Sequence, residues 1–177
     1  MGLKSKPLDK TRRDAKAFSN RWLTVLNNGS PVASELFWID FLGNVLGVVK
    51  PLWKVEFNKQ CRWQKKYHIN DGKEPITVDL YGNRFGLLVS QEASDTADLK
   101  DAAYGKAASY AVFLDFPERP QHVIASNYRT MYMVDIHKPA NEPPVIIQLE
   151  TLAEQIQQFD FIRKSKASPC PWSLLHY

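Results

Sequence analysis

Residues 76–92 constrain the fold of this chain most, because they predict two strands close enough in sequence to form a hairpin. Apolar and polar side chains alternate over residues 76–81, which is the period of a strand with one buried face. Gly82 and Asn83 tolerate positive φ in a short turn, and residues 85–92 have the composition of a returning strand. We therefore expect Asp79 to point away from its apolar neighbours and to lie near the end of the second strand.

The patterns on either side of this hairpin predict an α/β fold. Apolar residues recur at helical spacing near 18–26, 31–46, 95–110 and 150–159, and strand patterns occupy 53–57, 122–127, 130–136 and 145–148. This order predicts a mixed central β-sheet flanked by helices. We place one domain at 18–163, between a basic N-terminal arm at 1–17 and a C-terminal tail or linker at 164–177.

Composition limits the class of protein before any motif does. A chain of 177 residues that is 44% hydrophobic and 24% charged has ordinary globular usage. Cys61 and Cys170 form no Cys-x-x-Cys pair, which favours a reducing compartment. No apolar run approaches the roughly 18 residues of a membrane span. We expect a soluble, cytoplasmic protein with no membrane partner.

Several enzyme classes lack their sequence signatures here. The chain contains no Gly-x-Gly-x-x-Gly, no Gly-rich loop ending in Lys-Ser or Lys-Thr, no Gly-x-Ser-x-Gly and no His-Glu-x-x-His. Its four histidines are scattered and have no metal-ligand spacing with each other or with the cysteines. Dinucleotide binding, P-loop chemistry, serine hydrolysis and a zinc site are therefore not indicated.

Basic residues gather in two stretches that are candidates for contact with DNA. One stretch lies in the N-terminal arm and the other in the connection 58–75, where Trp63 and Tyr67 are interleaved with cations. Cations neutralise phosphates and aromatic rings stack on bases, although solvated surfaces use the same residues. The candidate nucleic-acid-binding residues are Lys10, Arg12, Arg13, Arg62, Lys65 and Lys66.

A series of short motifs resembles the amino-terminal domain of the MmeI-type restriction-modification enzymes. The motifs are Phe18-x-x-Arg21-Trp22, Phe37-Trp38-Ile39-Asp40-Phe41, Asp79-Leu80-Tyr81 followed by Leu87-Leu88-Val89, and Pro120-x-His122-Val123-Ile124-Ala125-Ser126-Asn127. The resemblance implies a PD-(D/E)xK nuclease fold, which in that family precedes an adenine-specific DNA methyltransferase domain and a target-recognition domain. Methyltransferase motifs such as Asn-Pro-Pro-Tyr are absent from these residues. DNA is therefore the expected partner, together with methyltransferase or specificity domains in cis or in trans.

The catalytic signature that the resemblance implies is altered in this chain. DNA hydrolysis needs carboxylates that hold Mg²⁺ and a lysine beside the attacking water. The resemblance makes Asp79 the first carboxylate, but Ser90-Gln91-Glu92 stands where the family has Glu-x-Lys. One interpretation makes Glu92 a displaced second Mg²⁺ ligand and Lys106 the missing cation, with Glu35 as an outer acid. The other gives Asp79, Glu92 and Lys106 only local structural roles.

These observations predict a DNA-associated, nuclease-like domain with a degraded catalytic motif and no cleavage activity of its own. A first alternative is a Mg²⁺-dependent endonuclease that uses Asp79, Glu92 and Lys106. A second alternative is an interaction module for a DNA methyltransferase partner.

Overall fold

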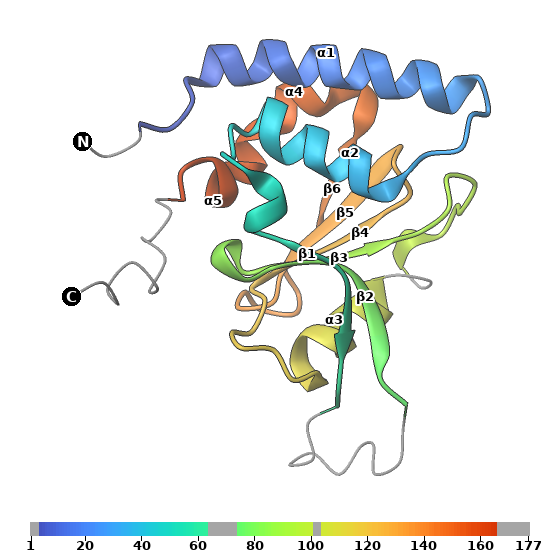
Figure 1. Cartoon of the computed structure of the whole chain (residues 1–177), viewed down its shortest axis with the longest axis vertical. Helices are drawn as coiled ribbons and strands as arrows, with labels where there is room; N and C mark the ends of the chain where they lie inside the picture. Colours follow the sequence, from blue (N-terminus) through green and yellow to red (C-terminus); the bar gives the residue numbers. More distant parts are fainter. Residues whose placement is uncertain (1–3, 64–73, 101–103, 166–177) are drawn as a thin grey trace.

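A six-stranded mixed sheet forms the centre of the protein (Figure 1). The computed structural model describes residues 4–63, 74–100 and 104–165. The strands lie side by side in chain order and are β1 (Glu56–Cys61), β2 (Ile76–Gly82), β3 (Leu87–Gln91), β4 (His122–Ser126), β5 (Thr130–Asp135) and β6 (Val145–Gln148). β3 and β4 are parallel, and the other neighbouring pairs are antiparallel. The expectation of a mixed sheet flanked by helices is confirmed.

One face of the sheet is covered by the N-terminal and C-terminal helices. These are α1 (Leu8–Asn27), α2 (Ser34–Asp40) with its π-helical continuation η1 (Phe41–Val45), and a run made of η6 (Leu149–Thr151), α4 (Leu152–Gln155), η7 (Ile156–Phe159) and α5 (Asp160–Arg163). Figure 1 shows α1 as the outermost layer, with α2 and α4 between it and the sheet. Phe18, Phe41 and Phe159 are fully buried there and pack at ring-centroid distances of 5.4 and 4.8 Å. This is the larger hydrophobic core.

The opposite face of the sheet carries α3 (Gly105–Phe113). Ala107 and Ala111 are fully buried, and side chains this small allow the helix backbone to approach the strands closely. They pack with Val78, Leu88 and Val123 in a second core cluster. In β3, Leu87 and Val89 belong to the larger core while Leu88 belongs to the second, as strand alternation requires.

Helix α1 begins at Leu8, so residues 8–17 are not the separate arm that their charge suggested. Thr11 and Ala15 are fully buried, and with Phe18 they follow the four- and three-residue spacing of a helix face. Small residues such as these give a weak apolar signal, and the surrounding cations masked it. None of the helices in the described ranges is long and apolar enough to span a membrane.

Two connections also differ from the sequence-based expectation. The strand expected at 53–57 begins at Glu56, because Pro51–Trp53 instead form a 3₁₀ turn, η2, with proline at its first position. The β2–β3 hairpin exists, but its turn is a 3₁₀ segment, η4 (Asn83–Phe85). Positive φ occurs at Gly86, at 61°, rather than at Asn83. Glycine is the residue that adopts this conformation at the lowest cost.

Candidate functional site

The strand alternation of β2 breaks at Asp79, and this break creates the candidate site. Val78 belongs to the core against α3, whereas Leu80 belongs to the core against α1 and α2. Residues two apart on a regular strand share a face, so the expectation that residues 76, 78 and 80 share one is wrong. On β1, Asn58 lies opposite Asp79 and has a φ of 50°. This local rotation leaves Asp79 on the α2 side of the sheet.

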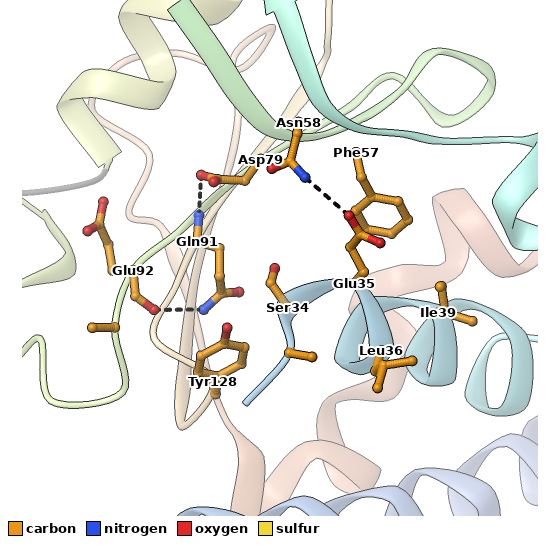
Figure 2. Close-up of a pocket in the computed structure, with 12 residues that line it drawn as sticks. Ser34, Glu35, Leu36, Ile39, Phe57, Asn58, Asp79, Gln91, Glu92 and Tyr128 are labelled. Carbon is orange, nitrogen blue, oxygen red and sulfur yellow. Dashed lines mark hydrogen bonds between the residues drawn. The ribbon is translucent and has the colours of Figure 1, made fainter. Parts of the chain in front are cut away.

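Asp79 lines an open pocket of about 530 Å³ between α2 and the sheet (Figure 2). Its lining residues come from the α2 N-terminus, β1, β2, the end of β3 and the β4–β5 turn, and they are Ala33, Ser34, Glu35, Leu36, Ile39, Phe57, Asn58, Asp79, Gln91, Glu92, Ala93 and Tyr128. Within the described ranges, non-glycine residues with positive φ are Lys50, Asn58 and Tyr128, and the last two line this pocket. Strained backbone of this kind gathers at functional sites.

Gln91 is the residue of β3 that lies beside Asp79. Its backbone N–H donates a hydrogen bond of 2.9 Å to Asp79 Oδ2. Its side-chain Oε1 accepts a hydrogen bond of 2.9 Å from Trp38 Nε1, and its Nε2 donates to the carbonyl oxygens of Glu92 and Ser126, each at 3.0 Å. The amide is therefore held at both ends by partners that a carboxylate could not all match.

Ser90 lies on the other face of the sheet from Asp79. It is 5% exposed, pairs with Ala125 of β4, and does not line the pocket. The sequence comparison with the family motif Glu-x-Lys placed Ser90 at the position of the second carboxylate, next to Asp79. The structure puts Gln91 there instead, because the rotation of β2 brings Asp79 to the odd-numbered face of β3.

Glu92 lines the same pocket as Asp79. It directly follows the end of β3 at Gln91, and its N–H donates a hydrogen bond of 2.7 Å to the Ser126 carbonyl. Glu35 lines the pocket from α2, where its Oε1 accepts a hydrogen bond of 3.1 Å from Asn58 Nδ2. Figure 2 shows these carboxylates around one opening.

Tyr128 closes the pocket beneath Gln91. Burial raises the pKa of its hydroxyl, a hydrogen bond with Ser34 opposes the shift, and the negative charge of Asp79 adds to it. Both Tyr128 and Asp79 line this pocket. Tyr128 could not be singled out from the hydrophobic pattern, because its importance comes from a positive φ that the pattern does not reveal.

Lys106 does not join Asp79 and Glu92. It is an exposed residue of α3, on the opposite face of the sheet, and its Nζ lies 5.8 Å from the ring centre of Tyr110. It does not line the pocket. Of the three residues proposed to act together, the structure brings only the two carboxylates to one place. A lysine that replaces the missing cation is not supplied by α3.

The candidate DNA-contacting residues that the structure describes do not form one surface. Lys10, Arg12 and Arg13 are exposed on α1, where Arg12 lies 3.9 Å from Asp9. Arg62 is exposed just beyond β1, and Figure 1 shows the outer ends of β1 and β2 at the end of the molecule opposite α1. Lys65 and Lys66 lie outside the described residues.

The pocket fits a magnesium centre of the nuclease type only in part. Carboxylate oxygens of Asp79 and Glu92 are the ligands that Mg²⁺ prefers. One Asp79 oxygen is already engaged by the Gln91 N–H, the neighbouring position of β3 carries an amide, and the lysine lies elsewhere. Among the described residues, no three Asp, Glu, His or Cys side chains form a group that could hold a metal ion. The complete Mg²⁺, carboxylate and lysine arrangement is therefore not assembled.

Comparison with known protein families relates most of this chain to one of them. The family model described as "MmeI, N-terminal domain" matches residues 13–168, which is most of the chain. No curated protein sequence and no solved structure matches this chain. The matched region contains the whole sheet, all residues of the pocket and most of α1.

Proposed function

The chain belongs to the family of the MmeI N-terminal domain, a restriction-modification domain, and from this membership we propose that it is a DNA-associated, nuclease-like domain that does not cleave DNA by itself. The observation that carries the proposal is the identity and bonding of Gln91. A PD-(D/E)xK site needs a carboxylate on the strand next to the one that bears the first aspartate. Here that position holds an amide fixed by Trp38 and by the carbonyls of Glu92 and Ser126.

The charge balance of the pocket supports the same proposal. Attack on a phosphodiester requires that negative charge on the phosphate and on the nucleophile be compensated. The pocket presents Glu35, Asp79 and Glu92, and none of its lining residues in the described part of the chain is a lysine or an arginine. A phosphate approaching without a cation would meet only negative charge, so the pocket by itself repels its supposed substrate.

The proposed DNA association depends on the family and on surface charge. The formal net charge is +4, and Lys10, Arg12 and Arg13 are exposed on α1, where a duplex can reach them. We place the partner domains, a methyltransferase and a specificity domain, in cis or in trans. In this arrangement the domain contributes DNA contact or assembly, and its partners supply sequence recognition.

A second candidate is a Mg²⁺-dependent endonuclease with a rearranged site. Its supporting observation is that Asp79 and Glu92 line one pocket at which Asn58 and Tyr128 adopt strained backbone conformations. Asp79 and Glu92 would hold the ion, which would polarise the phosphate and lower the pKa of a bound water. Its cation would have to come from a partner domain or from DNA-bound metal, since Lys106 lies on the other face of the sheet.

Two measurements on the same preparation test the proposal. Supercoiled plasmid is incubated with the protein and Mg²⁺ or Mn²⁺, and binding of a DNA duplex is measured over a series of salt concentrations. We expect no nicking above a protein-free control. We also expect the logarithm of the binding constant to fall linearly with the logarithm of the salt concentration, with a slope of about −0.9 per phosphate contacted. Asp79→Ala is the matched control for adventitious nuclease, because contamination cuts equally in its presence.

Each alternative has its own outcome. Metal-dependent nicking that disappears in Asp79→Ala would establish the endonuclease. Absence of duplex binding even at low salt would favour the interaction module for a methyltransferase partner and would end the proposal of direct DNA association.

A further inference from the structure

The turn that precedes β1 displays an exposed tryptophan, Trp53, on a surface that also carries three cations. We call it the Trp53 surface, and it consists of Val49, Lys50, Leu52, Trp53, Lys54 and Arg84. Trp53 is 78% exposed and Leu52 is 59% exposed, which places them among the most exposed large hydrophobic side chains of the described residues. Exposed tryptophan is uncommon on a surface that serves no contact.

The turn is held rigidly, so the exposure of Trp53 is a property of the fold. Val48 and Val55 are buried on either side of it and anchor both of its ends. Inside the turn, the N–H groups of Trp53 and Lys54 donate hydrogen bonds of 3.0 and 2.9 Å to the carbonyls of Lys50 and Pro51. Lys50 takes a left-handed conformation with φ of 52°, which costs free energy in a lysine. Strained backbone conformations such as this one persist where the surrounding structure holds them, and they gather at functional sites.

The cations of the Trp53 surface have no acidic counterpart. Lys50 Nζ lies over the Trp53 ring, 4.4 Å from its centre. In the described part of the chain, no ion pair joins Lys50, Lys54 or Arg84 to a carboxylate. Glu56 of β1 pairs with Tyr81 of β2, so Lys54, just before β1, and Arg84, just after β2, lie at the same end of this strand pair. Burial lowers the pKa of Lys54, and the charge of Arg84 lowers it further. Like charges held side by side favour an anion between or above them.

We propose that the Trp53 surface binds an unpaired nucleic-acid strand, with a base stacked on Trp53 and the adjoining phosphates on Lys54 and Arg84. One ring face carries Lys50, yet the side chain is 78% exposed, so the other face is open to a base. An aromatic ring next to cations is the combination that single-strand binding proteins use. A protein partner would have to match the cations with acidic groups, whereas every nucleotide brings its own phosphate. This inference rests on the proposed DNA association and names the contact that makes it.

The inference is tested by fluorescence anisotropy with the full chain, using a labelled single-stranded oligonucleotide and the duplex of the same sequence. Trp53→Ala is expected to weaken single-strand binding by roughly 5- to 150-fold, which is the range for loss of one stacked base. Ile146→Ala, at an exposed residue of β6, is the matched control and leaves the affinity unchanged. Thermal unfolding of each variant verifies that the fold is intact.

Charge reversals give a second, independent measurement. Lys54→Glu and Arg84→Glu, made singly, are each expected to make the slope of log affinity against log salt shallower by about 0.7. Lys138→Glu, in an exposed loop outside the Trp53 surface, keeps the wild-type slope.

The outcomes separate this inference from the proposed function. Single-strand binding that Trp53→Ala leaves unchanged, or that Lys138→Glu lowers as much as Lys54→Glu, overturns the Trp53 surface while DNA association stands. Equal loss of duplex and single-strand binding in Trp53→Ala overturns base stacking. Failure of the wild-type chain to bind either DNA overturns the proposed function and this inference together.

Discussion

Gln91 is the residue on which the proposed loss of cleavage depends, since it occupies the position of β3 beside Asp79. Its side-chain oxygen accepts a hydrogen bond from the Trp38 indole, and its side-chain nitrogen donates to two backbone carbonyls. Both N–H groups of the amide are therefore used. A carboxylate of the same shape accepts but cannot donate. Metal-dependent cleavage would require a carboxylate at position 91, whereas the hydrogen bonds to Glu92 and Ser126 require an amide there.

Gln91→Glu is expected to destabilise the fold by about 1–3 kcal/mol, since a carboxylate oxygen would face the carbonyls of Glu92 and Ser126 without a donor between them. The measurement is urea unfolding near neutral pH, where the introduced group is ionised. Gln157→Glu, the same substitution at an exposed residue of η7, is the control and changes stability little. Equal stability of the two variants would show that the position accepts a carboxylate, and the main support for the proposed loss of cleavage would be gone.

Residue identity was easier to predict from the sequence than residue environment. Asp79 stood out because the family resemblance puts the first carboxylate there, and the structure places it in a pocket. Gln91 gave no signal, since its importance comes from which face of β3 lies against Asp79. That depends on the rotation at Asn58 and Asp79, and a positive φ at an asparagine leaves no mark on the hydrophobic pattern.

At the scale of elements, Asp40 joins α1 to α2. Its carboxylate accepts hydrogen bonds from Arg21 at 3.0 Å, from Trp22 Nε1 at 2.9 Å and from Asn44 Nδ2 at 2.8 Å. Burial by itself would raise the pKa of Asp40, but these bonds outweigh it and lower the pKa. The sequence motifs at residues 21–22 and 37–41 are thus two halves of one contact, which explains why they occur together.

Asp40→Asn is expected to cost about 1–3 kcal/mol at neutral pH, because charge-assisted hydrogen bonds become neutral or are lost. A carboxyl with a lowered folded pKa stabilises the protein above its unfolded pKa of about 3.9, and that stability disappears as pH falls through the folded value. Unfolding free energies measured from pH 7 downward should therefore fall less steeply below about pH 4 in Asp40→Asn than in wild type.

Asp95→Asn, at an exposed residue after β3, serves as the control for removal of one carboxyl and should keep the wild-type profile. Parallel pH profiles for Asp40→Asn and wild type would mean that Asp40 titrates alike in both states. The proposed stabilising contact of Asp40 between α1 and α2 would then have to be rejected.

The sequence predicted the existence of most helices and strands from their apolar patterns, but it predicted their ends less well. The strand at 145–148 was placed correctly, and the hairpin of β2 and β3 was recognised. The first strand was displaced because Trp53 and Val55 suggested alternation, whereas proline in a 3₁₀ turn leaves Trp53 outside the sheet. Hydrophobic pattern cannot separate a buried tryptophan from one displayed for contact.

At the scale of the whole molecule, residues near both ends of the described chain meet. Arg163 is 9% exposed, its Nη1 donates a hydrogen bond of 2.7 Å to the Lys6 carbonyl, and it pairs with Asp160 at 2.7 Å. The Lys6 Nζ in turn donates to the Val45 carbonyl at 3.0 Å and pairs with Asp14. Residues 6–17, which the sequence predicted to belong to a basic N-terminal arm, are therefore bound into the fold on both sides of Pro7.

This closure predicts that Arg163 stabilises the molecule far more than its neighbour in sequence. Arg163→Ala leaves the Lys6 carbonyl without its donor and Asp160 with only the exposed Lys164, so we expect a loss of about 3 kcal/mol in unfolding free energy. Lys164→Ala also removes a partner of Asp160, but at the surface, and should cost well under 1 kcal/mol. Urea unfolding gives both values, and hydrogen exchange in α1 locates the effect, because release of Lys6 should raise exchange at the start of that helix while leaving β3 and β4 protected. Similar costs for the two variants, or faster exchange spread evenly over the sheet, would show that the chain ends do not close the fold in this way.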